Sequence, residues 1–207
     1  MTDWVVRMAA LGEVAAWEKF LTAGERERVG KISNETLRAR FVVSRGLRRA
    51  VLAECTGRAA GDLEFYEDGE SKPRLVDGEG WDFNLSHAGD YVVVVAGRMA
   101  VGVDLEKVRE VREMSALVTR YFHAEEAAAW TALGEGLREE AFFVLWSARE
   151  AAMKCAGLGL AKGLAVTRVD PVILTQPAAD AVVGAMTVRV ERRDAPAGYV
   201  MVGAEEK

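Results

Sequence analysis

The sequence predicts a mixed α+β protein, because strand-like and helix-like patterns are interspersed along its 207 residues. The run from 91 to 96 is unbroken, apolar and rich in valine, and glycine-containing pairs flank it, which is the pattern of a buried strand. Residues 99–106 alternate instead, so Val101, Val103 and Leu105 are expected to share the inward face of a second strand. Apolar positions at helical spacing predict long helices over 37–54 and 139–156.

The remaining segments show shorter versions of these patterns. Thr22 is the expected N-cap of a helix that opens with Glu25, and Gly57 is expected to end the helix over 37–54. A turn is expected at Asp68-Gly69, after a strand over 63–67. We also predict helices over 14–20, 114–121 and 125–133, and strands over 165–169, 185–190 and 199–202 separated by turns rich in proline, alanine and glycine.

Composition excludes several classes of protein. Hydrophobic residues make up 50% and charged residues 29% of the chain, an ordinary balance for a globular protein. No apolar stretch approaches the roughly 20 residues that span a bilayer, so we expect neither a signal peptide nor a membrane helix, and a cytoplasmic location. The net charge of −5 disfavours a protein that coats nucleic acid. Cys55 and Cys155 lack metal-site spacing and are expected to be buried fillers.

The outward face of the predicted strand over 99–106 is the first candidate site. Gly102, Asp104 and Glu106 share that face, where two carboxylates could hold a hard divalent cation and the glycine leaves room for something to approach. The alternative is the half-solvated face of an edge strand. Residues 84–89, Asn-Leu-Ser-His-Ala-Gly, are the second candidate, either an anion-binding turn or an ordinary polar turn that enters a strand.

The predicted helix over 139–156 provides a third candidate. Phe143, Ser147, Glu150 and Lys154 fall on one stripe at helical spacing. A Glu to Lys pair at this spacing is common on exposed helices, but here the surrounding positions are apolar. Asp104, Glu106 and Glu150 could therefore form a three-carboxylate cation site, with Lys154 one helical turn away and His87 nearby. Mg²⁺ prefers such oxygen ligands and commonly bridges them to phosphates.

The predicted helix over 37–54 is rich in arginine, which is unusual in an acidic protein. These side chains either lay their stems over the core or grip phosphate oxygens in pairs. Lys72 lies in a loop beside Pro73, where a lysine is stiffer than elsewhere on a surface. The arginines are Arg38, Arg40, Arg45, Arg48 and Arg49.

Two of these segments together resemble the paired signature of the 4′-phosphopantetheinyl transferases. They are Val-Gly-Val-Asp-Leu-Glu at 101–106 and Trp-Ser-Ala-Arg-Glu-Ala-Ala-Met-Lys at 146–154. Residues 84–87 and Ser71-Lys72-Pro73 match further elements of the family in the expected order, and the resemblance extends from about Leu21 to Gly159. The length resembles that of the surfactin-synthetase-activating type. That type implies a monomer of two similar α/β subdomains with pseudo-twofold symmetry and the active site between them, which we divide into 1–107 and 108–207.

The resemblance implies transfer of the 4′-phosphopantetheine arm of coenzyme A to a serine of an apo acyl, polyketide or peptidyl carrier protein, with release of adenosine 3′,5′-bisphosphate. Asp104, Glu106 and Glu150 would hold Mg²⁺, or Mn²⁺, against the pyrophosphate of coenzyme A. Glu150 would be the base toward the carrier serine, directly or through a water on the metal, and Lys154 the acid toward the leaving phosphate. The residues implied in coenzyme A binding are Arg28, either Arg40 or Arg45, Lys72, Asn84, Ser86 and His87.

Four points stay open. Arg149 stands where the family usually has a lysine, and the acidic residue that some members carry after the metal strand could be Glu125 or Glu126, of which we favour Glu126. The basic residues Lys107, Arg109, Arg112 and Arg120 form either a patch for an acidic carrier or a solvated face. The alternatives to the transferase are a metal-dependent nuclease, which the helical Glu150 and Lys154 spacing and the acidic chain disfavour, and a non-catalytic protein that binds coenzyme A or a carrier.

Overall fold

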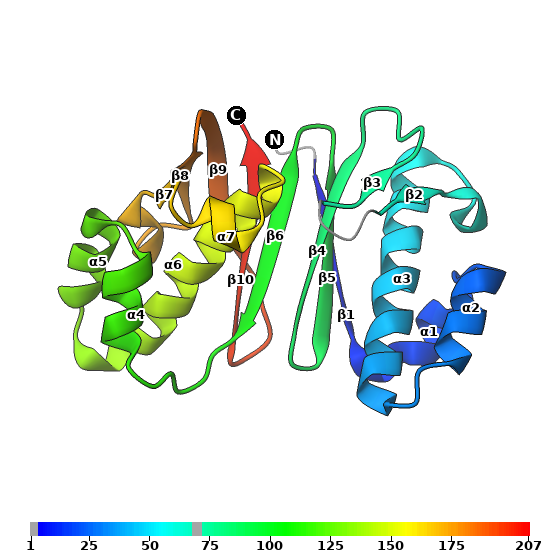
Figure 1. The fold of residues 1–207 in the computed structure, drawn as a ribbon, viewed down its shortest axis with the longest axis horizontal. Coiled ribbons are helices and arrows are strands. Elements are labelled where there is room, and N and C mark those ends of the chain that lie inside the picture. Colours follow the sequence, from blue (N-terminus) through cyan, green and yellow to red (C-terminus); the bar gives the residue numbers. More distant parts are fainter. Residues whose placement is uncertain (1–3, 68–71) are drawn as a thin grey trace.

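The protein is a mixed α+β fold of two α/β halves, described in a computed structural model over residues 4–67 and 72–207. Two sheets face each other between two helical layers (Figure 1). In the N-terminal half the sheet order is β1-β5-β4, built from β1 (Val5–Ala10), β5 (Tyr91–Gly97) and β4 (Asp82–Ala88). The C-terminal half has the order β6-β10-β9-β8-β7, from β6 (Val101–Lys107), β10 (Tyr199–Glu206), β9 (Met186–Arg193), β8 (Ala178–Val183) and β7 (Thr167–Val169).

The helices of the N-terminal half are those that the sequence predicts, but the helix predicted over 14–20 ends at Glu18 and the one predicted over 37–54 is longer at both ends. Helix α3 (Glu35–Thr56) begins after Asn34, whose side chain accepts a hydrogen bond from the Leu37 amide, and ends at Gly57 with φ +71°. Thr22 caps α2 (Ala23–Gly30) through a reciprocal pair of bonds with Glu25. Helix α1 (Val14–Glu18) and the short hairpin of β2 (Phe65–Tyr66) and β3 (Arg74–Leu75) complete this half. The expected turn at Asp68-Gly69 lies outside the described residues.

In the C-terminal half, α6 (Glu135–Cys155) lies across the sheet (Figure 1). Helices α4 (Met114–Tyr121), α5 (Ala124–Thr131) and α7 (Leu160–Gly163) surround it, and the three predicted strands correspond to β7, β9 and β10. The interpretation of the residues before 185 as turn was wrong, because Ala178–Val183 forms β8. Its inward positions are held by small residues, Ala179, Ala181 and Val183, which give a weak strand signal. Within the described residues, every helix is too short or too polar to cross a bilayer.

The unbroken apolar run of β5 is explained by burial on both faces. Val92, Val94 and Ala96 pack against α3, whereas Val93 and Val95 pack against β6 and β10 in the layer between the two sheets. Val101, Val103 and Leu105 of β6 lie in that same layer, as their alternation predicts. A strand covered on both sides has no polar face, so its sequence does not alternate.

The expected polar turn at residues 84–89 is instead mostly strand. Asp82–Ala88 forms β4, which pairs antiparallel with β5, and the reversal is confined to Gly89 and Asp90. The alternating polar side chains of β4 face β6, the neighbouring edge of the other sheet. The amides of Val101, Val103 and Leu105 donate to the side-chain oxygens of Asp82, Asn84 and Ser86, at 2.8, 3.3 and 3.3 Å. Side chains thereby replace the carbonyl groups that an edge strand otherwise lacks, and they join the two halves.

The opposite face of β6 is covered by α6, so it is not the half-solvated face of an edge strand. Gly102 allows this close contact, because a Cβ atom added there would lie 2.0 Å from the carbonyl oxygen of Ala151. What approaches the glycine is therefore the helix itself. As a result, Asp104 and Glu106 of β6 lie beside Glu150 and Lys154 of α6.

Candidate active site

The carboxylate of Asp104 is the centre of a polar cluster between β4, β6 and α6. Asp104 is only 2% exposed, and its Oδ1 atom accepts hydrogen bonds from Lys154 Nζ at 2.6 Å and from the Ser86 hydroxyl at 3.0 Å. Lys154 Nζ also lies 3.1 Å from Ser86 Oγ and 3.5 Å from Glu150 Oε2. The structure thus brings together Ser86, Asp104, Glu150 and Lys154, which lie far apart in the sequence.

The acidic residues of this cluster repel one another. Burial, together with the charges of Asp104 and Glu106, raises the pKa of Glu150 to about 7 despite the neighbouring Lys154 ammonium. Burial and the Asp104 charge also raise the pKa of Glu106. Lys154 and the exposed Arg109, which lies 3.4 Å from Glu106, therefore leave negative charge on this face incompletely neutralised. A carboxyl group with a pKa near neutrality is suited to accept a proton.

The donor set fits a hard divalent cation. The second oxygen of Asp104, Oδ2, is buried and has no hydrogen-bond partner, which is unusual for a carboxylate. As the side chains are arranged, however, no three carboxylate, imidazole or thiol groups in the described part of the chain lie close enough together to hold a metal ion. Asp104, Glu106 and Glu150 would have to draw together around the ion, which would occupy the free side of Asp104.

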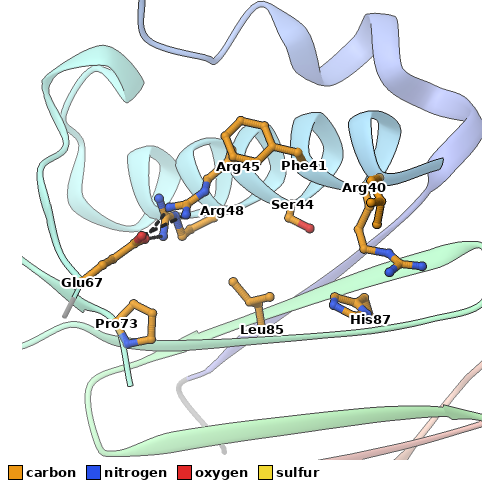
Figure 2. A pocket seen from close by; sticks show the side chains of 10 residues that line it. Arg40, Phe41, Ser44, Arg45, Arg48, Glu67, Pro73, Leu85 and His87 are labelled. Atoms are coloured by element: carbon orange, nitrogen blue, oxygen red, sulfur yellow. Dashed lines mark hydrogen bonds and ion pairs between the residues drawn. The ribbon is translucent and has the colours of Figure 1, made fainter. Parts of the chain in front are cut away.

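A cavity of about 440 Å³ lies between α3 and β4, and one of its lining residues, His87, is close enough to Asp104 and Lys154 for their charges to act on it. Figure 2 shows Arg45, Arg48 and Glu67 at one end and Arg40 with His87 at the other. Between the two ends, Phe41, Ser44 and Leu85 line the wall. Partial burial and the positive charge of Arg40 lower the pKa of His87, so near neutral pH the imidazole acts as a neutral hydrogen-bonding group.

The arginines of α3 do not have equivalent surroundings. Arg45 binds Glu67 through both of its terminal nitrogens, one of them 2.9 Å from Oε2, and Arg48 also pairs with Glu67. Arg40 takes part in none of the ion pairs found among the described residues, and its buried Nε atom has no hydrogen-bond partner. Arg40 therefore has unused donors toward the cavity.

Three other residues implied in coenzyme A binding have protein partners. The ammonium of Lys72 pairs with Asp82 and donates to the Val101 carbonyl at 2.6 Å, and it is Pro73 that lines the cavity. Asn84 is buried, and its Oδ1 accepts from the Val103 amide. Arg28 is exposed and lies over the ring of Phe41, 5.4 Å from its centroid. Ser71 lies outside the described residues.

Sequence reasoning missed Glu67 as a cavity residue, and the structure shows why the signal was absent. Glu67 follows β2, whereas Arg45 and Arg48 are one helical turn apart on α3. Only the packing of the β2–β3 hairpin against α3 brings them together. The one available signal was the density of arginine on a helix of an acidic protein, which calls for acidic partners.

Arg149 and Glu126 form an ion pair that lies inside the protein, on another side of α6. Both side chains are 1% exposed, and Arg149 Nη1 lies 3.0 and 2.7 Å from the two Glu126 oxygens. Arg149 also donates to the Leu164 carbonyl at 2.6 Å. Glu125 is exposed, so of the two glutamates only Glu126 has a defined internal partner.

The predicted basic patch is solvent-exposed in the structure. Lys107, Arg109, Arg112 and Arg120 are all exposed, on the end of β6, the following loop and α4. Arg109 lies 3.4 Å from Glu106 and stacks over the ring of Phe143, 5.5 Å from its centroid. The patch therefore adjoins the acidic cluster through Arg109 and Glu106.

Comparison with known proteins matches both halves of the chain to one group. Residues 9–99 match a family described as 4′-phosphopantetheinyl transferase, N-terminal, and residues 100–195 match the 4′-phosphopantetheinyl transferase superfamily. The chain is 30% identical over 167 residues to 4′-phosphopantetheinyl transferase HetI of Nostoc sp., covering 76% of this chain and 70% of HetI. It is 31% identical over 125 residues to the transferase psf-1 of Bacillus pumilus, covering 60% of this chain and 53% of the relative. For the transferase Sfp of Bacillus subtilis, the identity is 25% over 141 residues, with 68% of this chain and 62% of Sfp covered.

Proposed function

The chain belongs to the 4′-phosphopantetheinyl transferase superfamily, as a two-domain member of the Sfp type, and we propose that it transfers the arm of coenzyme A with the cluster around Asp104. The acceptor is a serine hydroxyl of an apo carrier protein, and the second product is adenosine 3′,5′-bisphosphate. Membership of this family disfavours a nuclease. A protein that only binds coenzyme A would not need the acidic groups and the lysine, all of which are present.

The observation that carries the proposal is the unpartnered Oδ2 atom of Asp104, beside two carboxyl groups of raised pKa. A buried carboxylate oxygen without a partner costs stability, so it is expected where a ligand completes the site. Asp104, Glu106 and Glu150 would hold Mg²⁺ there. Bound at that position, Mg²⁺ would neutralise charge that builds on the leaving phosphate. Mn²⁺ accepts the same oxygen ligands.

The protein's own residues can be assigned to the proton transfers. Glu150 accepts the proton of the carrier serine as the serine oxygen forms its bond to the phosphorus next to the pantetheine arm. The bond from that phosphorus to the bridging oxygen of the pyrophosphate breaks, and Lys154 donates a proton, or its charge, to the departing phosphate. Ser86 keeps Lys154 and Asp104 in place, because it lies within hydrogen-bond distance of both.

The cavity between α3 and β4 is the proposed site for the nucleotide part of coenzyme A. The His87 end of the cavity is the one that approaches Asp104 and Lys154, so a nucleotide bound there would extend its pyrophosphate toward Asp104. Arg40 is favoured over Arg45 as the phosphate contact, because Arg45 is already paired with Glu67. His87 would donate from its neutral ring, and Arg28, which lies over the ring of Phe41, would act beside the cavity. Lys72 would have to leave Asp82 to reach a phosphate. The exposed basic patch beside Glu106 is the proposed contact for an acidic carrier.

The test is intact mass spectrometry of an apo acyl carrier protein and an apo peptidyl carrier protein, each incubated with this protein, coenzyme A and Mg²⁺. We expect a mass gain of one phosphopantetheine arm, which disappears with EDTA and with Glu150→Ala. The relative rates on the two carriers would then begin to identify the natural partner.

The control is Glu125→Ala, which removes an exposed glutamate outside the cluster and is expected to transfer at the normal rate. If neither carrier gains mass while coenzyme A still binds, the proposed activity is wrong and the protein is a binding member of the family. Transfer that survives both EDTA and Glu150→Ala would contradict the assignment of the site.

A further inference from the structure

The two ends of the nucleotide cavity differ in charge. At the end formed by Arg45 and Arg48, Glu67 pairs with both guanidinium groups (Figure 2). At the other end, Arg40 has no carboxylate partner among the described residues and points toward His87 (Figure 2). A carboxylate in a cavity for an anionic ligand is unexpected, because it lowers the positive potential that attracts phosphate.

The position of Glu67 is fixed by a network that also holds Arg48. The Arg48 side chain is 2% exposed, and its guanidinium lies over the ring of Phe65, 3.6 Å from the centroid. On its far side, Arg48 Nη2 lies 3.9 Å from Glu25, and Arg49 anchors Glu25 at 2.8 Å. Arg48 is thus locked in place, and Glu67 neutralises a charge that cannot move away.

Apolar groups line the cavity next to the neutralised end. Pro73 lies beside Glu67, and Phe41 and Leu85 form opposite walls of the cavity (Figure 2). An uncharged planar ring fits such surroundings, whereas a phosphate would meet the carboxylate of Glu67. The unneutralised end offers a guanidinium and an imidazole, which together suit a phosphate monoester.

We propose that Glu67 determines ligand specificity by closing one end of this cavity to phosphate, so that a nucleotide enters with its ring at Glu67 and its phosphate monoester at Arg40. The inference rests on the proposed function, because it takes the cavity as the nucleotide site. It goes further in naming the residue that sets the orientation and in predicting that its loss opens a second phosphate site at Arg45 and Arg48.

The first test uses inorganic phosphate as the probe. Its binding to the full chain is measured by phosphorus NMR titration. We expect wild type to bind phosphate at one site, which Arg40→Gln weakens about tenfold, the loss expected for one charge-assisted contact. We expect Glu67→Gln to gain a second site of comparable affinity, and the double variant with Arg45→Gln to lose it again. Glu64→Gln, which removes the same charge from an exposed position outside the cavity, is the matched control and should leave one site.

The second test compares coenzyme A with dephospho-coenzyme A by calorimetry. We expect wild type to prefer coenzyme A about tenfold, Arg40→Gln to abolish that preference, and Arg45→Gln to retain it. Thermal unfolding of each variant verifies that it is folded.

These outcomes distinguish a failure of the proposed function from a failure of the inference about Glu67. If wild type binds neither form of coenzyme A, the proposed function fails, whereas the phosphate titration of Glu67→Gln still decides whether Glu67 closes one end of the cavity. The inference itself is overturned if Glu67→Gln binds phosphate as wild type does, or if the preference for coenzyme A is lost in Arg45→Gln and kept in Arg40→Gln.

Discussion

Two buried carboxylates of this protein, Glu126 and Asp104, differ in how completely their oxygens are hydrogen-bonded. Each oxygen of Glu126 accepts two hydrogen bonds, one from Arg149 and one from a backbone amide, of Val169 or of His123. Asp104 is buried almost as deeply, yet its Oδ1 takes both available donors and its Oδ2 has none. A buried acid with complete partners serves the fold, whereas one with a free oxygen is ready for a ligand.

The difference is built on consecutive residues of α6. Arg149 points toward α5 and β7, where it holds Glu126 and the carbonyl of Leu164. Glu150 points toward β6, where Asp104 and Glu106 repel it. One helix therefore carries a structural ion pair on one side and an acidic face on another. An arginine at 149 holds this ion pair better than a lysine would, since its fork reaches Glu126 and Leu164 together.

Asp104→Asn should produce the largest effect on activity. The substitution keeps the shape and removes the charge that a cation would need, and metal ions supply several kcal/mol of charge stabilisation in such transfers. We expect kcat to fall by about 10³ or more. Intact-mass rates of carrier modification measure this, and urea unfolding without metal verifies that the variant is folded. Substantial activity in this variant would contradict the contrast with Glu126.

Glu126→Gln tests the opposite carboxylate. Breaking a buried ion pair leaves the Arg149 charge without a partner, so we expect a loss of about 3–5 kcal/mol in the free energy of unfolding. Activity per folded molecule should stay close to wild type. Urea unfolding measures the first quantity, and transfer rates below the unfolding temperature measure the second.

The exposed neighbour Glu125 provides the control, since Glu125→Gln should change stability by less than about 0.5 kcal/mol. Arg149→Lys keeps the charge and loses the bond to Leu164, so its expected cost is about 1 kcal/mol. A Glu126→Gln variant that is stable but inactive would move Glu126 into the catalytic machinery.

Gly102→Ala tests whether the close contact of α6 and β6 sets the acidic face. The added Cβ would meet the Ala151 carbonyl and the Cys155 amide at 2.0 and 2.5 Å, so strand and helix must separate. We expect a loss of about 1–3 kcal/mol in stability, together with reduced activity, because Asp104 and Glu150 move apart. Gly136→Ala, also in α6 but with nothing within 4 Å of its added Cβ, is the control and should be neutral or slightly stabilising. Equal effects of the two substitutions in urea unfolding would disprove this role.

Local patterns predicted one side of the comparison and not the other. Glu150 and Lys154 could be placed on one face because helical spacing alone determines it. In the same way, the unbroken apolar run of β5 predicts a buried strand. The partners of Glu126 could not be predicted, because α5, α6 and β7 meet only in the folded chain. The chemistry of the side chains suggested that Asp104, Glu106 and Glu150 form one cation site, and the family resemblance supplied the reaction and the role of each residue.

The error at β4 has a similar cause. Asn84 and Ser86 look like turn residues because polar side chains normally face water. Here they bind the amides of β6 across the junction of two sheets, an arrangement that the sequence of either strand alone does not indicate. Glu67 was missed for the same reason, since its arginine partners lie on a helix earlier in the chain.

Glu67 is intermediate between Glu126 and Asp104, because its carboxylate has arginine partners but remains open to solvent. Its substitution should have the smallest effect of those considered. Its hydrogen bonds to Arg45, and then those to Arg48, outweigh its desolvation and lower its pKa from 4.5 to about 2. A lowered carboxyl pKa stabilises the folded state above pH 4.5, and this contribution is lost as the pH falls from 4.5 toward 2. The full shift would correspond to about 3 kcal/mol, but solvent screening of a side chain that is 31% exposed reduces it to roughly 1 kcal/mol. In urea unfolding, wild type and Glu67→Gln should therefore differ by that amount above pH 5 and converge near pH 2. A difference that stays constant over this range would mean that the Arg45 and Arg48 pairs contribute through packing rather than through charge, and Glu67 would then resemble neither Glu126 nor Asp104.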